Sequence, residues 1–215
     1  MVHYKEDAML RRTLIQFLVG TAMGLGSGTA LAGEDFDIIE GIHYKPVPKP
    51  HATQQKTVTE IFYYGCPHCY HLEPSLDNWL KTKPADVTFN RVPAVLNNPN
   101  WIFMARVFYT AKELGILDQF HKAYFKAIQE EHKYIFTPEA LAEFVAPMGV
   151  TKADYIAMFK SFKVDQEVQK ARRLTEDYGV DGVPAIVVNG KYRTDVPMAT
   201  SKPKLWQVVN YLLNQ

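Results

Sequence analysis

Hydrophobic and polar residues follow different periods along successive parts of the chain. Residues Lys56–Tyr64 are rich in β-branched and aromatic side chains and end in a nearly continuous apolar run, which predicts a strand covered on both faces. From Cys66 onward apolar residues recur at helical spacing, and Val87–Val92 has the pattern of a second strand. A helix of this length between two strands predicts a parallel pair joined by a right-handed crossover.

The middle of the chain has a helical pattern only. No strand pattern occurs between Asn100 and about Tyr178, while Thr137-Pro138 and Thr151 are typical helix starts. The pattern predicts four or five consecutive helical stretches within residues 100–178. These stretches are Trp101–Leu114, Leu117–Glu131, Pro138–Met148, Lys152–Phe162 and Asp165–Tyr178.

The sequence after Gly179 again has the pattern of β-strands. Residues Ala185–Val188 predict a strand, Asn189-Gly190 predicts a tight turn, and Lys191–Thr194 predicts the returning strand of a hairpin. A last amphipathic helix is predicted from about Lys202 to Leu213.

Together these elements predict one α/β domain interrupted by helices. Residues 33–56 contain three prolines and predict an extended entry segment, with one edge strand around Ile42–Tyr44. Residues 33–99 and 179–215 would form the discontinuous α/β domain, and residues 100–178 an all-helical insertion.

The first 32 residues have the pattern of an export signal. Arg11-Arg12 precede the apolar run Thr13–Leu25, and the small residues of Ala30-Leu31-Ala32 predict cleavage after Ala32. The apolar run is too short for a transmembrane anchor. Export would place the protein in an oxidising compartment, where a disulfide can persist.

Composition and charge narrow the functional classes. The chain is 47% hydrophobic and 22% charged, as expected of a folded globular protein. Its 24 Lys and Arg residues nearly balance its 23 Asp and Glu residues, and removal of residues 1–32 takes away three basic and two acidic residues, which leaves a formally neutral chain. The excess positive charge of a nucleic-acid-binding protein is missing, so we expect no nucleic-acid partner.

The two cysteines of the chain stand in the motif Cys66-Pro67-His68-Cys69. Two cysteines placed at random in a chain of this length would fall three apart on the order of one time in a hundred. At a helix start, Cys66 would lie where unpaired backbone N–H groups and the helix dipole stabilise a thiolate, with Cys69 one turn further along and within disulfide reach. His68 adds a donor and a potential positive charge. The motif therefore predicts a reactive disulfide that is easily reduced, which biases the pair toward oxidising its partners.

Three other roles could explain this motif. A structural disulfide is a poor explanation because so small a loop gains little stability from closure. Cys66, His68, Cys69 and His71 could instead hold zinc, although closed zinc sites usually take ligands from two separated segments. Haem attachment would need a histidine directly after Cys69, where the chain has Tyr70.

Glu60 lies inside the apolar strand, six residues before Cys66. Period-two alternation places it on the face of Phe62 and Tyr64, where an unpaired carboxylate is costly to bury. Glu60 is therefore either a solvent-facing strand residue or a buried acid that exchanges protons with the cysteine pair. Arg91, on the next strand, is the candidate charge partner of a buried Glu60.

These segments resemble the DsbA family of periplasmic thiol:disulfide oxidoreductases. The resemblance rests on EIFYYGCPHCY at Glu60–Tyr70 and GVPAIVVNGKY at Gly182–Tyr192, with a helical insertion between them, and covers essentially all of the exported chain. It implies a thioredoxin-like α/β fold with an inserted all-helical domain. It also implies that Val183–Pro184 is a cis peptide that faces the cysteines and binds substrate backbone, beside a loop at Asp195–Ala199.

The resemblance further implies the roles of the site residues. Cys66 would form the mixed disulfide and Cys69 would resolve it. Pro67 and His68 would tune the redox properties of the pair, and Glu60 would match the buried acid of the family.

The implied function is that of a periplasmic enzyme that donates its Cys66–Cys69 disulfide to the thiols of unfolded exported proteins. It would need no external cofactor or metal, act as a monomer, and be reoxidised by a quinone-linked membrane oxidase resembling DsbB. A reductase or disulfide isomerase on the same fold is the alternative, although such isomerases carry an N-terminal dimerisation domain for which residues 33–56 leave no room. A chaperone-like or metal-carrying module is a further alternative.

Overall fold

The computed structural model describes residues 36–133 and 135–215, so the predicted export signal lies outside the described residues. Asp37–Gln215 form one compact unit. The unit contains a five-stranded sheet with the order β1-β5-β4-β2-β3. The strands are β1 (Lys45–Pro46), β2 (Lys56–Phe62), β3 (Val87–Pro93), β4 (Ala185–Val188) and β5 (Tyr192–Thr194).

The central strand β2 has a parallel neighbour on one side and an antiparallel neighbour on the other. It pairs in parallel with β3 and antiparallel with β4, and β5 continues the sheet from β4. The predicted parallel pair and the predicted hairpin are therefore confirmed. In the β2–β3 register Glu60 lies opposite Arg91, which places both side chains on one face of the sheet.

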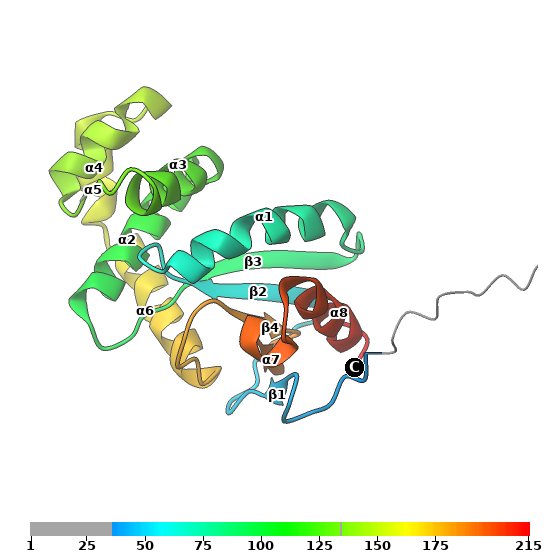
Figure 1. Cartoon of the computed structure of the whole chain (residues 1–215). Helices are drawn as coiled ribbons and strands as arrows, with labels where there is room; N and C mark the ends of the chain where they lie inside the picture. Colours follow the sequence, from blue (N-terminus) through cyan, green and yellow to red (C-terminus); the bar gives the residue numbers. More distant parts are fainter. Residues whose placement is uncertain (1–35, 134) are drawn as a thin grey trace, which may run out of the picture. The chain divides into compact units, whose positions relative to one another are not determined.

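Helix α1 (Pro67–Thr82) connects β2 to β3 and runs alongside both strands (Figure 1). Pro67 opens the helix, where the N–H that proline lacks would have no partner in the helix. The helix buries Cys69, Leu72, Leu76 and Trp79. Trp79 stacks on Trp206 of the last helix, α8 (Lys202–Leu212), with ring centroids 5.0 Å apart.

The segment between β3 and β4 is helical, as predicted, and contains no strand among its described residues. Its helices are α2 (Pro99–Glu113), α3 (Leu117–Gln129), α4 (Pro138–Val145), a short 3₁₀ turn (Ala146–Met148), α5 (Lys152–Phe159) and α6 (Phe162–Asp177). The buried core is continuous between these helices and the sheet. The division into a discontinuous α/β domain and a helical insertion domain stays a prediction.

Two predicted element boundaries and one predicted loop were wrong. Phe162 opens α6 rather than closing α5, because the Ser161 side chain accepts a hydrogen bond from the Val164 N–H and caps the new helix. The edge strand expected at Ile42–Tyr44 is instead β1, which pairs with β5. Residues Val196–Ala199 form a short helix, α7, where only a loop was expected.

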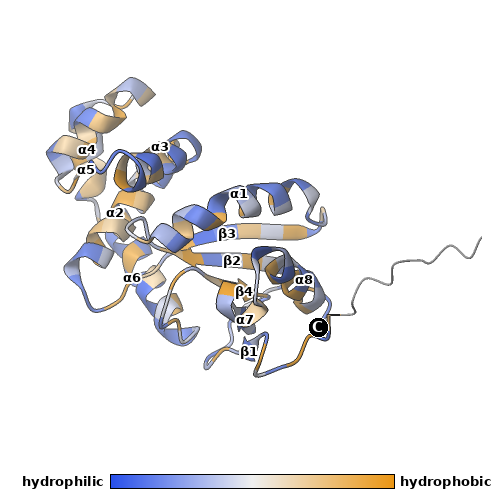
Figure 2. Cartoon of the chain, in the orientation of Figure 1, coloured by the Kyte–Doolittle hydropathy of each residue, from blue (hydrophilic) through white to orange (hydrophobic). Residues whose placement is uncertain are grey.

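Hydrophobic and hydrophilic residues occupy the same helices, as Figure 2 shows for α1 and α8. Such helices bury one face and leave the other to solvent. Within the part of the chain that the structure describes, no helix has the length and apolar character needed to cross a membrane.

The turn at Asn189-Gly190 gives a test of the fold. Both residues have positive φ, 53° and 62°, and a Cβ on Gly190 would lie 1.9 Å from the carbonyl oxygen of His51. We expect Gly190→Ala to lower the free energy of unfolding by about 3 kcal/mol, because the backbone strain adds to a clash with main chain. Gly149→Ala is the control, since Gly149 has φ 86° but an open surrounding. It should cost only ~1 kcal/mol in denaturant unfolding, and equal losses in the two variants would contradict the clash.

Candidate active site

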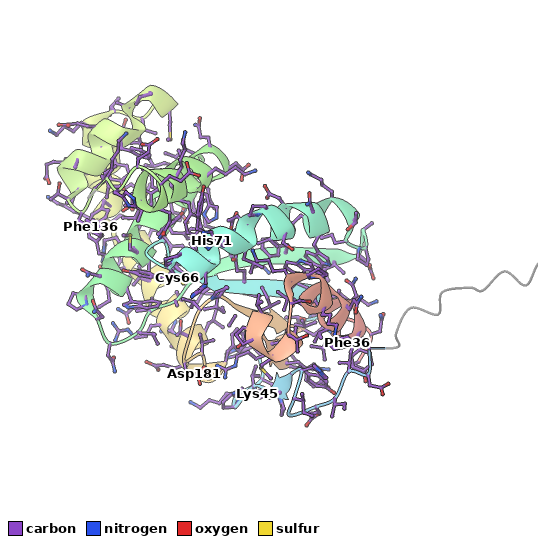
Figure 3. The ribbon with its side chains drawn as sticks, viewed as in Figure 1. Phe36, Lys45, Cys66, His71, Phe136 and Asp181 are labelled. Carbon is purple, nitrogen blue, oxygen red and sulfur yellow. The ribbon has the colours of Figure 1, made fainter. Side chains whose placement is uncertain are left out.

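Cys66 occupies the N-cap of α1, in the turn that follows β2 (Figure 3). Its φ and ψ of −94° and 115° are extended, and its N–H donates to the Tyr63 carbonyl over 3.0 Å. The structure describes both cysteines as free thiols, with Cys66 partly exposed and Cys69 buried. The two sulfurs therefore differ in access to a substrate.

Local hydrogen bonds make Cys66 acidic. The hydrogen bond from Cys69, together with the backbone N–H groups of Cys69 and His68 and the charge of His68, outweighs burial and lowers the pKa of Cys66 to about 6. The ordinary value for a cysteine is about 8.5. Cys66 is thus largely a thiolate at neutral pH, which is the nucleophilic and good leaving form of the residue.

Cys69 has the opposite character. Burial, the hydrogen bond with Cys66 and the negative charges of Cys66 and Glu60 raise the pKa of Cys69 far above its usual range. A reduced Cys69 therefore keeps its proton at neutral pH.

Glu60 is fully buried, so the prediction of a buried acid describes its position and the solvent-facing alternative is wrong. Its Oε2 accepts from the Arg91 Nε over 3.1 Å, as the predicted charge partner requires, while Oε1 has no hydrogen-bond partner within the described part of the chain. Burial, and then the nearby charge of Glu73, raise the pKa of Glu60 to about 8 in spite of Arg91. Glu60 is therefore mostly protonated at pH 7 and can give up or take a proton near that pH.

Sequence reasoning missed two members of this buried group, Glu73 and His121. The Arg91 guanidinium also contacts Glu73, with Nη2 3.0 Å from Oε2. His121 of α3 lies 3.4 Å from Glu73 through Nε2 and 3.0 Å from the Tyr64 hydroxyl through Nδ1. A charged residue on the buried face of α1 was the available signal for Glu73, whereas no local pattern marks His121.

Val183 and Pro184 lie beside the cysteine motif. The bond between them is cis, as the resemblance implied, and the Cys66 sulfur lies 3.4 Å from the Val183 carbonyl oxygen, to which it can donate only in its thiol form. Both residues line a groove of about 480 Å³ that also includes His68 and the first residues of α7. The structure thus brings the turn of Cys66 and His68 together with Val183, which is 117 residues from Cys66 in sequence, next to this groove.

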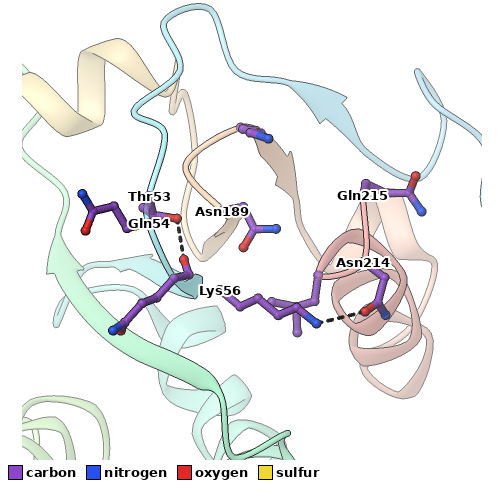
Figure 4. A pocket seen from close by; sticks show the side chains of 9 residues that line it. Thr53, Gln54, Lys56, Asn189, Asn214 and Gln215 are labelled. Atoms are coloured by element: carbon purple, nitrogen blue, oxygen red, sulfur yellow. Dashed lines mark hydrogen bonds between the residues drawn. The ribbon is translucent and has the colours of Figure 1, made fainter.

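Another cavity, of about 380 Å³, lies at the opposite end of β2 from Cys66 (Figure 4). Its lining includes Lys56, whose Nζ donates to Asn214 over 3.1 Å. This cavity contains neither cysteine. Across residues 36–133 and 135–215, no group of three or more His, Cys, Asp or Glu side chains is arranged to hold a metal ion.

Comparison with known proteins identifies a family. Residues 83–210 match the DSBA-like thioredoxin domain. The thiol:disulfide interchange protein DsbA of Burkholderia cepacia is 36% identical over 200 residues, which cover 92% of each chain. DsbA of Pseudomonas aeruginosa is 37% identical over 92% of this chain and 95% of its own.

Solved structures show the same fold. The crystal structure of Pseudomonas aeruginosa DsbA superposes with a TM-score of 0.77 over 83% of this chain and 94% of the other, at 37% identity. Proteus mirabilis DsbA, 29% identical with a TM-score of 0.71 over 84% of this chain and all of the other, has been solved with a non-covalently bound peptide, PWATCDS. The predicted thioredoxin-like α/β fold is therefore confirmed. The chain belongs to the DsbA family of thiol:disulfide oxidoreductases.

Proposed function

We propose that the protein introduces disulfide bonds into exported proteins by transferring its own Cys66–Cys69 disulfide. The observation that carries this proposal is the contrast between the two sulfurs, since Cys66 is partly exposed and acidic while Cys69 is buried and keeps its proton. A pair with this contrast is more stable reduced than an ordinary dithiol, and it therefore gives its disulfide away readily.

In the first step a substrate thiolate attacks the Cys66 sulfur of the oxidised pair. A bond forms between the substrate sulfur and Cys66, the Cys66–Cys69 bond breaks, and the electron pair leaves on Cys69. That sulfur needs a proton because its thiolate is strongly disfavoured. Glu60 is the proposed donor, since it is protonated near neutral pH and lies close enough for its charge to raise the pKa of Cys69.

In the second step another thiolate of the substrate attacks the substrate sulfur of the mixed disulfide. The substrate disulfide forms, and Cys66 leaves as the thiolate that the α1 N-terminus stabilises. The substrate has lost two electrons and two protons. The enzyme holds both electrons as the Cys66 thiolate and the Cys69 thiol.

The groove beside Val183 and Pro184 is the proposed site for substrate backbone. Proline has no N–H, and the partly exposed Val183 can pair with an extended peptide as an added strand. The peptide bound to the Proteus mirabilis relative supports the proposal that the protein binds peptides. Pro67 and His68 complete the proposed site as residues that tune the cysteine pair.

Location and partners follow from the same proposal. Residues 1–32 would direct export to the periplasm and be removed after Ala32, and the mature protein would act there as a monomer. No external cofactor takes part in either step. The reduced pair would pass its electrons to a quinone-linked membrane oxidase resembling DsbB.

Substitution of each cysteine tests the proposed roles. With a peptide that contains two cysteines, Cys66→Ser should lose oxidase activity by at least about a thousandfold, because the attacked sulfur is gone. Cys69→Ser should accumulate a covalent complex through Cys66, which mass spectrometry of the digested adduct identifies. Adducts on Cys69 in the Cys66→Ser protein, at wild-type rates, would reverse the assignment.

Equilibration of the cysteine pair with glutathione distinguishes an oxidase from a reductase or isomerase. An oxidase pair with an acidic Cys66 should be largely reduced at a low ratio of reduced to oxidised glutathione, whereas a reductase pair would stay oxidised. Titration of the reduced protein with zinc, followed by thiolate absorbance, tests the metal-carrying alternative.

A further inference from the structure

Two residues of helix α3 bind Tyr64, one at its backbone carbonyl and the other at its side-chain hydroxyl. The Gln129 Nε2 donates to the Tyr64 backbone carbonyl over 2.7 Å, and His121 contacts the Tyr64 hydroxyl over 3.0 Å. Tyr64 is fully buried and lies two residues before Cys66. We call the contacts of Gln129 and His121 with Tyr64 the α3 clamp.

The protonation of the clamp follows from its chemistry. Burial lowers the pKa of His121, so its ring is neutral, and Glu73 carries a charge because His121 and Arg91 lower its pKa in spite of burial. A charged carboxylate only accepts hydrogen bonds, so Nε2 of His121 donates to Glu73 and Nδ1 is left as an acceptor. The Tyr64 hydroxyl must therefore donate to Nδ1.

The hydrogen bond between Tyr64 and His121 has one direction, from the Tyr64 hydroxyl to the His121 ring. Burial raises the pKa of Tyr64 well above its usual range, so the hydroxyl retains the proton that it donates. Through Glu73 the chain of contacts continues to Arg91, which is itself hydrogen-bonded to Glu60. Loss of the Tyr64 hydroxyl would leave a buried acceptor on His121 without a donor.

The position of Tyr64 limits where the Cys66 sulfur can lie. Only Gly65 separates the two residues, and the Cys66 N–H is itself bonded to the Tyr63 carbonyl, so the turn has little freedom once Tyr64 is held. The sulfur owes part of its acidity to the N–H groups of His68 and Cys69. Such bonds weaken steeply when distance or angle changes.

From this geometry we infer that Gln129 and His121 are positioning residues for Cys66: by holding Tyr64, helix α3 keeps the Cys66 sulfur against the first turn of α1 and so sets its reactivity. Neither residue contacts the sulfur. The helical segment between β3 and β4 thus acts on the chemistry at Cys66 although it contributes no reacting atom.

Two variants in the full chain test the clamp, one at each end of Tyr64. Gln129→Leu removes the donor to the carbonyl, and because Gln129 is only partly buried we expect the protein to fold. Tyr64→Phe removes only the hydroxyl. In each variant we expect the Cys66 pKa to rise by about half a unit and the glutathione equilibrium constant to move about threefold toward the disulfide form.

The pKa is read from thiolate ultraviolet absorbance, to which only Cys66 contributes near neutral pH because Cys69 stays protonated. Since both contacts hold the same residue, the double variant should shift the pKa by a different amount from the sum of the single shifts. Thr175→Val is the control. It removes a buried hydrogen bond to the Val95 N–H of 3.1 Å, which should cost about 1 kcal/mol and leave the Cys66 pKa unchanged.

Folded Gln129→Leu and Tyr64→Phe proteins that lose stability but keep the wild-type pKa and glutathione equilibrium would overturn the inference. So would an equal pKa shift in Thr175→Val. The inference rests on the proposed role of Cys66, and the two fail differently. Activity that survives Cys66→Ser would remove the role, whereas an unchanged pKa in the clamp variants would remove only the inference.

Discussion

Replacing Glu60 with Gln is expected to raise the free energy of unfolding by about 4 kcal/mol more at pH 9 than at pH 4. The reason is the raised pKa of about 8 for Glu60 in the folded protein, against 4.5 for an ordinary glutamate. The folded state therefore holds this proton more tightly than the unfolded state. Wild-type stability is lost as pH rises from about 4.5 through 8, and a glutamine, which has no proton to lose, avoids that loss.

The full shift corresponds to ~5 kcal/mol, and most of it falls between these two pH values. A weaker contact of glutamine with Arg91 would lower the stability of the variant equally at both pH values. Denaturant midpoints of both proteins between pH 4 and pH 9 provide the measurement. Glu73→Gln is the matched control with the opposite sign, because the pKa of Glu73 is lowered. It should destabilise the protein at neutral pH, with a cost that shrinks as pH falls. A Glu60→Gln difference that does not grow with pH would contradict the buried-acid assignment.

Reducing the Cys66–Cys69 disulfide is expected to favour the folded protein increasingly as pH rises. The pKa of Cys66 is about 6 in the folded protein, so the thiolate adds stability above that value, reaches its full effect above the unfolded value near 8.5, and loses it as pH falls through 6. Between pH 5 and pH 9 the free energy of unfolding of reduced relative to oxidised protein should grow by about 2 kcal/mol, which allows for solvent screening of a half-exposed sulfur.

The comparison uses the slope with pH because closing the small disulfide loop adds its own, pH-independent term to the oxidised form. Guanidinium unfolding of both forms at each pH gives the difference. The Cys66→Ser variant, compared with the variant in which both cysteines are serine, should gain no stability with pH, because the raised pKa of Cys69 can only lower its relative stability above about pH 8.5. A difference between the two redox forms that is flat from pH 5 to pH 9 would mean that Cys66 is not acidic.

The elements that carry the cysteine motif could be predicted because their signals are local. The strand before Cys66, the helix after it and the Asn189-Gly190 hairpin each have a short pattern with one physical meaning. The helix boundary at Phe162 was predicted wrongly, because an apolar residue normally indicates burial. Phe162 is instead 73% exposed at a helix start. The four residues of α7 are too few to show a period.

Those residues of the candidate site that lie in local sequence patterns could also be predicted. The cysteines, Glu60 and Arg91 each lie in a short pattern, and the strand register then brings the last two together. His121 has no such signal, because its partner Tyr64 is 57 residues away and only the packing of α3 on the strand end joins them. Hydrogen bonds between side chains of separate elements therefore cannot be predicted from local sequence patterns.

The order of the strands also determines when the site can assemble. The Cys66 sulfur and the Val183 carbonyl that it contacts are 117 residues apart, and β4, which carries the chain on from Pro184, pairs directly with β2. A chain synthesised from its N-terminus exposes both cysteines long before the proposed peptide-binding surface exists, while one edge of β2 is still unpaired. Such long-range pairing is slow and leaves the edge open to other chains. Maturation of this protein therefore has an interval in which its cysteines can react but cannot yet select a substrate.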